Sequence, residues 1–427
     1  MAKALSAEQK VLIIGASHGG ISMAEQLRKQ GFEGGITLID REASMPMERP
    51  PLSKAWLMAA DDDEGTEKTG SFLMRQPEWF VEHNVVFKKG CDAVAADPAA
   101  KTVTLSDGEV LQWDQLVLAT GAVPRALPLT DDVKASGRVH VLRVPADAEG
   151  LSKGMTIDGS SAKNIAIIGG GYIGLEVAAS ARKRGLNVTV IEMAPRLLAR
   201  VASPQASQYF HDLHIAHGTT IMTNAAVQDI TASDEGLTIM VKTDKGEIAL
   251  EVDLALAGIG VIPDMALAED LGLETGNGFI VDGDYRTAQE DIWAIGDVAL
   301  ATEGYTQGKM RIESVHHAQM SAEIAAAVMM GATPKTHEVP WFWSEQYDKK
   351  LQSAGLVPEG AETISRAGKR EGAMSFWSFD QGVLTAVESI ADPQAYMIGK
   401  TVITEGTPLT PDQIADPEFA LKSLIGR

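Results

Sequence analysis

The sequence predicts an α/β protein with two similar βαβ domains and a smaller α/β domain at its C-terminal end. Two observations predict this fold class. One is an internal near-repeat, VLIIGASHGG at residues 11–20 and IAIIGGGYIG at residues 165–174. The other is a tail from about residue 331, in which Trp-rich and alternating segments are typical of a separate small domain. Self-similarity within one chain indicates two copies of one supersecondary unit.

The residue pattern of each copy predicts a strand, a glycine turn, a helix and a second strand, in this order. In the first copy, apolar residues recur at helical spacing until Gly31, and the strand ITLID ends at Asp40. In the second copy, the helical pattern ends near Gly185, and the strand VTVIE ends at Glu192. Helical periodicity closed by glycine marks a helix and its C-terminus. The sequence therefore predicts two βαβ units.

Short strands are expected around the second copy. Asp107-Gly108, between TVTL and VLQW, is typical of a β-hairpin turn. Further strand-like segments lie at 219–224, 237–242 and 247–257. The expected domains are a discontinuous first domain (1–120 with 254–330), a second domain (121–253) and a third domain (331–427).

The net charge and the residue patterns of the sequence exclude several classes of partner and site. A net charge of −21 opposes binding to nucleic acid or to an anionic membrane. The sequence shows no signal-peptide core and no apolar span of 18 residues, so we expect a cytoplasmic protein. We expect no metal site, because His211 and His217, the outer members of a histidine triplet with His214, lie about 600° apart in helical phase.

The second glycine turn carries the full pattern of a dinucleotide-binding fingerprint, with Gly169, Gly171 and Gly174. Such a turn places backbone N–H groups and the positive end of a helix dipole against a pyrophosphate. Glu192 follows at the spacing of the acid that holds a ribose 2′-hydroxyl. A carboxylate there repels a 2′-phosphate, which favours NADH over NADPH. Arg196 is near enough in sequence to weaken this preference.

The first glycine turn is less regular, with Gly15 and Gly20 in place and Ser17 at the middle position. Asp40 supplies the acidic residue 20 positions after Gly20. Either turn alone is also compatible with an ordinary tight βα connection. The two turns together, each with its acid, predict two Rossmann-like domains that bind two dinucleotides.

Two further segments extend the pattern, LVLATGAVPR at 116–125 and IWAIGDVA at 292–299. With the two fingerprints they resemble the two-dinucleotide flavoprotein fold of the glutathione reductase kind. The resemblance implies that FAD occupies the first domain and NADH the second. It implies that the chain crosses between them at Ala119, Thr120 and Gly121, and that Asp297 binds the flavin's ribityl chain.

Four motifs give a narrower resemblance: RPPLSK (49–54), APRLLARV (194–201), RIESVHHA (311–318) and VPWFWSEQYD (339–348). They are similar to the ferredoxin reductases of bacterial oxygenase systems, the family of putidaredoxin reductase, rubredoxin reductase and the aromatic-ring dioxygenase reductases. Ser17 and His316 depart from the family pattern, and Glu345 stands where Asp is more usual. These departures concern only the surroundings of the flavin ring, near His316.

The cysteine count decides how electrons would leave the flavin. Enzymes of the glutathione reductase kind pass them to a cysteine pair, whereas this chain has one cysteine, Cys91. Electrons would therefore pass to a partner. The resemblance implies a [2Fe–2S] ferredoxin, or rubredoxin, that supplies an oxygenase or cytochrome P450. Because such ferredoxins are acidic, docking needs a basic patch, for which the candidates are Arg311, Lys349, Lys350, Lys369 and Arg370.

The resemblance also assigns roles to individual residues. Lys54 and Glu176 would form an ion pair beside the flavin and act as the catalytic pair. Trp341 and Trp343 share one face of a strand, and Trp343 is favoured as the cofactor-side residue. The other candidate cofactor contacts are Arg49, Arg125, Ile173, Gly260 and Val315.

Other functions stay open at this point. A monodehydroascorbate-type reductase also lacks the cysteine pair. An NADH oxidase usually has a redox-active cysteine beside the flavin, and residues 41–60 contain none. A non-catalytic binding protein similar to apoptosis-inducing factor is a further alternative. The oligomeric state, monomer or homodimer, is not determined by the sequence.

Overall fold

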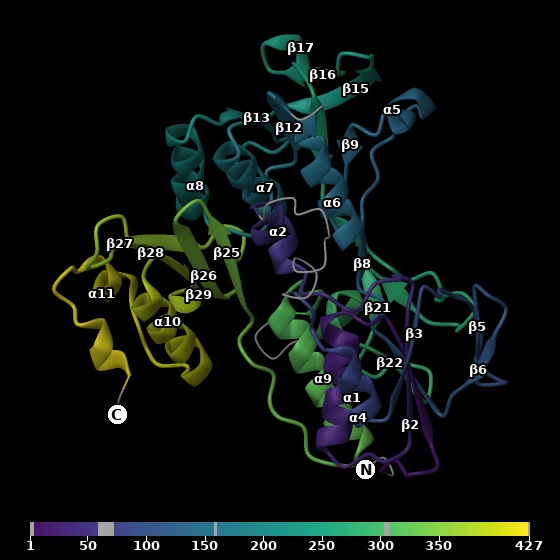
Figure 1. Ribbon diagram of the computed structural model, residues 1–427. Coiled ribbons are helices and arrows are strands. Elements are labelled where there is room, and N and C mark those ends of the chain that lie inside the picture. The colour runs from purple at the N-terminus through teal and green to yellow at the C-terminus, as the bar shows by residue number, and fades with distance from the viewer. Residues whose placement is uncertain (1–3, 59–71, 158–159, 303–307, 426–427) are drawn as a thin grey trace. The chain divides into compact units, whose positions relative to one another are not determined.

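The computed structural model describes residues 4–58, 72–157, 160–302 and 308–425. The chain divides into two compact units (Figure 1). The first consists of Met1–Glu48, Asp63–Val123 and Ile262–Pro340, and the second of Arg49–Asp62, Pro124–Val261 and Trp341–Arg427. The chain passes between them at β8 (Ala122–Pro124) and β19 (Val261–Pro263).

The first unit is built on a five-stranded parallel sheet in the order β22-β7-β1-β2-β3. Its strands are β1 (Lys10–Ile14), β2 (Gly35–Asp40), β3 (Val85–Lys89), β7 (Gln115–Leu118) and β22 (Ile292–Ala294). Helices α1 (His18–Lys29) and α9 (Val315–Met329) lie side by side and bury their apolar faces in this unit's core (Figure 1). The first predicted βαβ unit is thus present as β1, α1 and β2.

Smaller elements complete the first unit. An antiparallel meander contains β4 (Ala93–Asp97), β5 (Thr102–Leu105) and β6 (Val110–Gln112), and its last turn is the predicted hairpin. Gly108 has a φ of +88° there, a conformation that glycine adopts readily. The remaining elements are α4 (Pro77–Glu82), η2 (Gly296–Val298), β20 (Thr275–Gly276), β21 (Gly278–Ile280), β23 (Ala299–Thr302) and β24 (Lys309–Met310).

The second unit repeats the parallel plan in the order β14-β13-β12-β18-β9. Its strands are β9 (Val139–His140), β12 (Asn164–Ile168), β13 (Asn187–Ile191), β14 (Thr220–Met222) and β18 (Leu254–Ala257). Its helices are η1 (Pro50–Ser53), α2 (Ala55–Met58), α5 (Asp131–Ala135), α6 (Pro145–Gly154), α7 (Tyr172–Lys183) and α8 (Pro204–Ala216). Antiparallel pairs are β10 (Thr156–Ile157) with β11 (Ser160–Ser161), and β15 (Ala226–Ala232) and β17 (Gly246–Val252) on either side of β16 (Leu237–Thr243).

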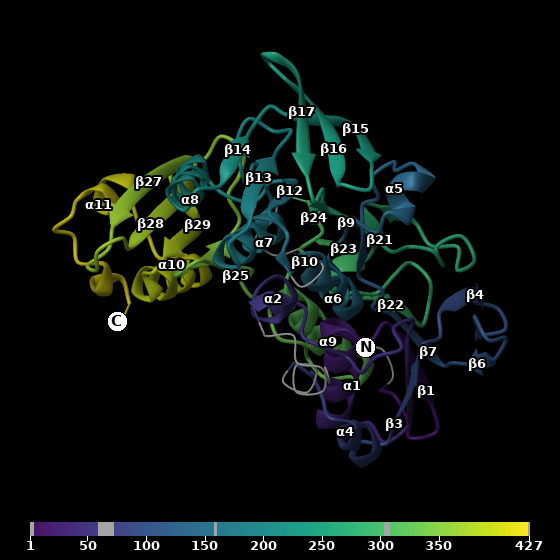
Figure 2. The same ribbon diagram turned by 45° about the horizontal axis from the view of Figure 1, so that its top comes forward.

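The C-terminal part of the second unit is a five-stranded antiparallel sheet in the order β25-β26-β29-β28-β27 (Figure 2). Its strands are β25 (Trp341–Gln346), β26 (Lys349–Gly355), β27 (Glu362–Ala367), β28 (Met374–Asp380) and β29 (Val383–Ile390). Helix α10 (Pro393–Glu405) packs on β29 and β26, and α11 (Pro411–Ala415) and η3 (Leu421–Leu424) follow. Leu351, Phe376 and Ile390 of this sheet share one apolar core with α7 and α8.

Two details differ from the expectations drawn from sequence. The segment 247–257, expected as one strand, is two strands in different sheets. The Asp253 carboxylate accepts the backbone N–H groups of Lys163 and Asn164 at 2.8 and 2.7 Å, and this contact fixes the turn between β17 and β18. Because β18 pairs with β12, residues 254–261 belong to the second unit and not to the first, as do residues 49–62.

A buried acid connects β29 to the start of α8. Both carboxylate oxygens of Glu388, which is 1% exposed, accept the backbone N–H of Ser203, at 3.2 and 3.1 Å. Ser203 is the N-cap of α8. Burial raises the pKa of the Glu388 carboxyl to about 7. In the folded protein the protonated form therefore predominates below about pH 7.

We predict that Glu388→Gln flattens the pH dependence of stability. A carboxyl with a raised pKa contributes stability below its unfolded value of about 4.5, and this contribution is lost as the pH rises through about 7. The free energy of unfolding of the wild type should fall relative to the variant by on the order of 2 kcal/mol between pH 5 and pH 8. Urea unfolding at both pH values measures this difference. Glu405→Gln, an exposed change on α10, is the control, and an equal response of both variants would contradict the prediction.

Candidate functional site

The turn between β1 and α1 has room only for glycine at two positions. Gly15 has a φ of +104°, and a Cβ there would lie 2.2 Å from the carbonyl oxygen of Ala119. A Cβ on Gly20 would lie 1.8 Å from the carbonyl oxygen of Gly15. The first residue makes the turn, and the second lets α1 approach the strand closely.

The turn between β12 and α7 repeats this geometry. Gly169 has a φ of +108°, and its Cβ would lie 2.3 Å from the carbonyl oxygen of Gly258. A Cβ on Gly174 would lie 2.2 Å from the carbonyl oxygen of Gly169. The two units thus hold the same backbone arrangement at corresponding places.

The middle position of each turn is the N-cap of a helix, Ser17 for α1 and Gly171 for α7. A Cβ on Gly171 would meet no atom within 4 Å, so the protein's own packing does not require glycine there. The Ser17 side chain accepts no N–H of its helix start, and Gly171 has no side chain that could do so. Tyr172, Ile173 and Gly174 lie in the first turn of α7, where an α-helix leaves its N–H groups without partners in the helix. Open space before such a helix start fits the phosphates of a dinucleotide.

The acidic residues at the strand ends hold the turns in shape. The backbone N–H of Ala16 donates to Asp40 Oδ2 at 2.8 Å, and that of Gly170 donates to Glu192 Oε2 at 2.6 Å. In each case the second carboxylate oxygen accepts the backbone N–H two residues further along the chain. A carboxylate oxygen can accept more than one hydrogen bond, so these contacts leave capacity for a ribose hydroxyl.

Lys54 and Glu176 meet in the second unit. Lys54 Nζ lies 2.7 Å from Glu176 Oε2, with the two side chains 18% and 4% exposed. The hydroxyl of Ser53 donates to the same oxygen at 2.5 Å, and that of Ser344 donates to Glu176 Oε1 at 2.6 Å. The carboxylate is thus surrounded by one ammonium and two hydroxyl donors, which offset the cost of burying its charge.

Three polar side chains near this pair were not predicted from the sequence: Ser344, Gln346 and His214. Each is fully buried, and Gln346 lies between the other two. Ser344 and Gln346 share a strand face with Phe342, whose ring centroid lies 4.5 Å from that of Tyr172 on α7, with the rings tilted by 38°. Alternating polar residues on the same face as an aromatic side chain were the available signal in the sequence.

Other candidate residues of the first unit lie near its glycine turn or at η2 and α9. The Thr120 hydroxyl donates to the carbonyl oxygen of Asp264 at 2.6 Å, and the N–H of Asp264 donates to the carbonyl of Gly121 at 3.0 Å. The half-buried carboxylate of Asp297 has no hydrogen-bond partner among the described residues. Val315 is the first residue of α9, and the hydroxyl of the N-cap Ser314 accepts the N–H of His317 at 3.0 Å.

The remaining candidates lie in the second unit. The guanidinium of Arg49 donates to the carbonyl of Arg143 at 3.1 Å, and the exposed Arg125 contacts Gly260 through its backbone N–H at 2.9 Å. Gly260 has a φ of +99°, which explains its residue type without a ligand. Trp343 is half-buried, with its ring 5.6 Å from that of Trp341.

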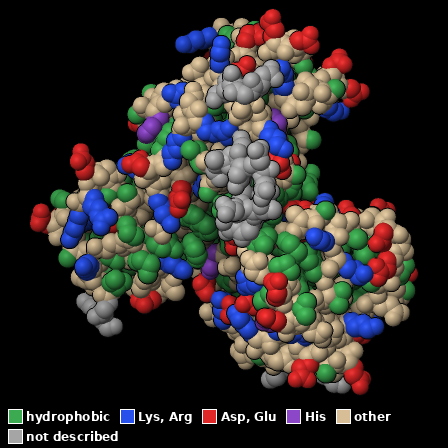
Figure 3. Space-filling model, in the orientation of Figure 1, with side chains coloured by type: hydrophobic (Ala, Val, Ile, Leu, Met, Phe, Trp, Pro, Cys, Tyr) green, Lys and Arg blue, Asp and Glu red, His purple; other side chains and the backbone are tan. Residues whose placement is uncertain are grey.

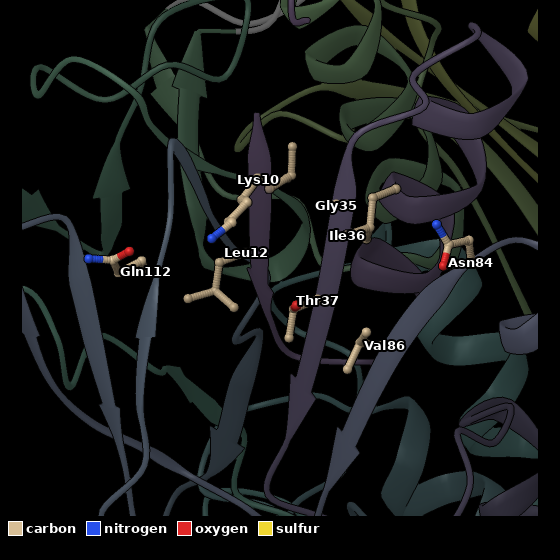
Figure 4. Close-up of a pocket in the computed structure, with 9 residues that line it drawn as sticks. Lys10, Leu12, Gly35, Ile36, Thr37, Asn84, Val86 and Gln112 are labelled. Carbon is tan, nitrogen blue, oxygen red and sulfur yellow. The ribbon is translucent and has the colours of Figure 1, made fainter. Parts of the chain in front are cut away.

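A pocket in the first unit is distinct from the glycine turns (Figure 4). It lies at the amino ends of the strands, beside Lys10 and Leu12 of β1, Gly35 and Thr37 of β2, and Val86 of β3. The glycine turn begins at the opposite, carboxyl end of β1, where ligands of open α/β sheets bind. We therefore do not assign the pocket to a dinucleotide.

Comparison with known proteins identifies the family. The family described as pyridine nucleotide-disulphide oxidoreductase matches residues 9–322, and a domain described as reductase C-terminal matches residues 341–425. The chain belongs to the pyridine nucleotide-disulphide oxidoreductases. The predicted fold class and the predicted resemblance are both confirmed.

Relatives of this oxidoreductase match along nearly its whole length. Rhodocoxin reductase of Rhodococcus erythropolis is 40% identical, over 98% of this chain and 94% of that protein. The crystal structure of the ferredoxin reductase for the CYP199A2 system of Rhodopseudomonas palustris is similar with a TM-score of 0.89 and 34% identity, covering 97% of this chain and 99% of that one. A covalent putidaredoxin reductase–putidaredoxin complex gives a TM-score of 0.90 at 33% identity, with 98% of both chains covered.

In the part of the chain that the structure describes, no helix is both long and apolar enough to cross a membrane.

We predict that two glycines of the α7 turn respond differently to alanine. Gly174→Ala should destabilise the oxidoreductase by about 3 kcal/mol, because the new Cβ overlaps the carbonyl of Gly169. Gly171→Ala should lower the free energy of unfolding by at most about 1 kcal/mol, which is the difference between glycine and alanine at an N-cap. It should weaken dinucleotide binding, because the methyl group enters the open space at the helix start. Urea unfolding and coenzyme titration measure the two effects. Equal destabilisation by both changes would show that the turn geometry is misassigned.

Proposed function

We propose that this oxidoreductase is an NADH-dependent, FAD-containing ferredoxin reductase that supplies electrons to an oxygenase or cytochrome P450 through a [2Fe–2S] ferredoxin or rubredoxin. The observation that carries the proposal is the pair of matching glycine turns in a chain with a single cysteine. Cys91 lies in the first unit with its Sγ 3.7 Å from Asp107 Oδ2 at the hairpin, and one thiol forms no dithiol. Electrons therefore need an external acceptor.

The first unit would hold FAD, and the parallel-sheet part of the second unit would hold NADH. Gly15, Ser17, Gly20 and Asp40 would contact FAD at the start of α1, and Asp297 would offer a carboxylate that bonds none of the described residues. Gly169, Gly171, Ile173, Gly174 and Glu192 would contact NADH. When bound, the flavin accepts a hydride from NADH and releases the electrons singly. Residues 341–425 would form the interface domain. A cytoplasmic location stays a prediction from the sequence.

Lys54 and Glu176 would form the catalytic pair of the proposed reductase. Glu176 holds the Lys54 ammonium at 2.7 Å, and the two hydroxyl donors restrict how the carboxylate can rotate. A cation fixed in a largely buried site stabilises negative charge that develops nearby more strongly than it would in water. Arg49, Arg125, Gly260, Val315 and Trp343 stay proposed cofactor contacts.

The names of the relatives support an iron–sulfur or similar redox protein as the partner. Two of the five residues of the expected basic patch, Lys349 and Lys350, are paired with acids within the C-terminal part. Lys349 Nζ lies 2.6 Å from Asp348, and Lys350 Nζ lies 3.4 Å from Glu345. Basic and acidic side chains are likewise intermixed on the face of this part shown at the left of Figure 3. Docking would then rest on shape and apolar contact more than on net charge.

We predict that ferredoxin controls the output of electrons. NADH-driven cytochrome c reduction should rise at least tenfold when a matching ferredoxin or rubredoxin is added, because the flavin's electrons need a one-electron carrier. Reduction of ferricyanide, a small acceptor, should need no such protein. The measurement is a steady-state assay with candidate ferredoxins from the same organism. Full activity with cytochrome c in the absence of any carrier would contradict the proposal.

The preference for NADH has a structural argument beyond Glu192. Arg196, the nearby cation, directs its guanidinium away from a coenzyme role, since its two terminal nitrogens donate to the carbonyls of Ala202 and Ala199, each at 3.0 Å. The Arg196 guanidinium is then not offered to a 2′-phosphate, and the Glu192 carboxylate would repel one.

We predict that Glu192→Gln lowers the preference for NADH over NADPH. The amide keeps an oxygen acceptor but removes the negative charge that opposes a 2′-phosphate. The ratio of the two kcat/KM values should fall on the order of tenfold, equivalent to about 1.4 kcal/mol. Asp40→Asn is the matched control in the first unit and should alter FAD retention while leaving the ratio unchanged. A change of the ratio in Asp40→Asn, or none in Glu192→Gln, would reverse our assignment of the two turns.

A further inference from the structure

The second unit contains a continuous row of buried polar side chains that ends on Glu176. Ser344 and Gln346 of β25 and His214 of α8 are each 0% exposed, and Glu176 of α7 is 4% exposed. Three elements that are distant in sequence thus place polar groups beside the apolar core of this unit. Burying this many polar groups is costly unless each finds a partner.

Each member of the row bonds the next. The Ser344 hydroxyl donates to Glu176 Oε1 at 2.6 Å, and Gln346 Nε2 donates to Ser344 Oγ at 3.2 Å. His214 Nε2 lies 2.9 Å from Gln346 Oε1, and the Tyr347 hydroxyl lies 3.2 Å from His214 Nδ1. The hydroxyl of Thr219 continues the row at 3.3 Å from that of Tyr347.

The chemistry of the groups sets the direction of every bond. An ionised carboxylate only accepts, so Ser344 donates to Glu176 and accepts from the Gln346 amide. The amide oxygen then faces His214 and requires a proton on Nε2. Burial lowers the pKa of His214 to about 4, so the ring is neutral near pH 7, and its Nδ1 accepts from Tyr347. All four donors therefore point towards Glu176.

We propose that Ser344, Gln346 and His214 are positioning residues, which hold the Glu176 carboxylate through a one-directional hydrogen-bond chain so that Oε2 faces Lys54. The proposal rests on the proposed function, in which Lys54 and Glu176 are the catalytic pair. Aligned donors polarise one another, so the last bond onto Oε1 is stronger than an isolated one. With Oε1 occupied, the carboxylate keeps Oε2 on Lys54 and Ser53.

The chain orients Glu176 and does not conduct protons. A hydroxyl or an imidazole can accept a proton on one side and release one on the other, whereas the Gln346 amide would have to change to its unstable imidic form. The amide lies in the middle of the row and interrupts any such path. If the row conducted protons, proton exchange with solvent would limit the rate of flavin reduction. The positioning role predicts no such limit.

The first test is the protonation state of His214 in the flavin-loaded protein. Nitrogen NMR of protein labelled on its nine histidines reports which ring nitrogen carries the proton, and His214→Phe assigns the signal. We expect a neutral ring with the proton on Nε2 at pH 7, and a shift of this signal in Ser344→Ala. A proton on Nδ1, or on both nitrogens, would reverse or break the chain and overturn the proposal.

The second test is a double-mutant cycle on thermal stability. Ser344→Ala should lower the midpoint of thermal unfolding of the flavin-loaded protein by about 2 °C. In a Glu176→Leu background the effect should be much smaller, because the acceptor of the Ser344 hydroxyl is already removed. Ser378→Ala is the control, since Ser378 is an equally buried hydroxyl in β28 that bonds Thr363 and not Glu176. Its effect should be the same in both backgrounds. Additive effects of Ser344→Ala would overturn the coupling.

The third test is stopped-flow reduction of the flavin by NADH. Ser344→Ala should slow the reduction about tenfold at saturating NADH, because it removes one hydrogen bond to a charged group. The affinity for NADH should stay unchanged. Ser378→Ala should leave the rate unchanged. If Ser344→Ala does not fold, Ser344→Cys, which keeps the size but donates weakly, takes its place with the same expected direction. An unchanged rate would show that the chain is structural only.

The outcomes separate this inference from the proposed function. A wild-type protein whose flavin NADH does not reduce would refute the proposed function, while the nitrogen NMR and the stability cycle would still decide whether the chain positions Glu176. Normal reduction of the flavin in the wild type, together with an unchanged reduction rate in Ser344→Ala, would refute the inference alone.

Discussion

A single buried carboxylate organises the second unit. Glu176 lies on α7, and its charge requires donors because burial without them is unfavourable. These come from Ser53 and Lys54 on one side and from Ser344 on the other, residues that lie more than a hundred positions from Glu176 in the chain. The requirement to satisfy this charge fixes the segment before α2, the middle of α7 and strand β25 against one another. Any role of the pair in catalysis depends on that arrangement.

The two glycine turns show a second constraint, that of backbone against backbone. In each unit the first and last glycines leave no room for a Cβ, because a carbonyl oxygen lies within about 2 Å of its place. The middle position is open in the second unit, and the first unit has serine there. Steric exclusion therefore explains two of the three glycines, and the space for a ligand explains the third. This distinction links the fingerprint to binding rather than to folding alone.

Local periodicity allowed much of the fold to be predicted. The strand, glycine turn and helix of each unit, and the hairpin at Gly108, have residue patterns that depend on near neighbours only. The same periodicity predicts a single strand for β17 and β18, because both segments contain frequent apolar residues and only Asp253 separates them. Whether a strand joins an antiparallel meander or a parallel sheet depends on distant partners. The domain boundary near residue 254 was misplaced for this reason.

The sequence by itself determined the family, the two dinucleotide turns with their acids, and the absence of a cysteine pair, since these depend on residue types at short spacings or on a count. Tertiary structure decided which polar side chains surround Glu176. His214 looked like one member of a surface triplet, yet it is buried and bonded to Gln346. The hydrogen bonds that connect β25 to α7 and α8 form because these elements pack together. The spacing of residues in the sequence does not predict them.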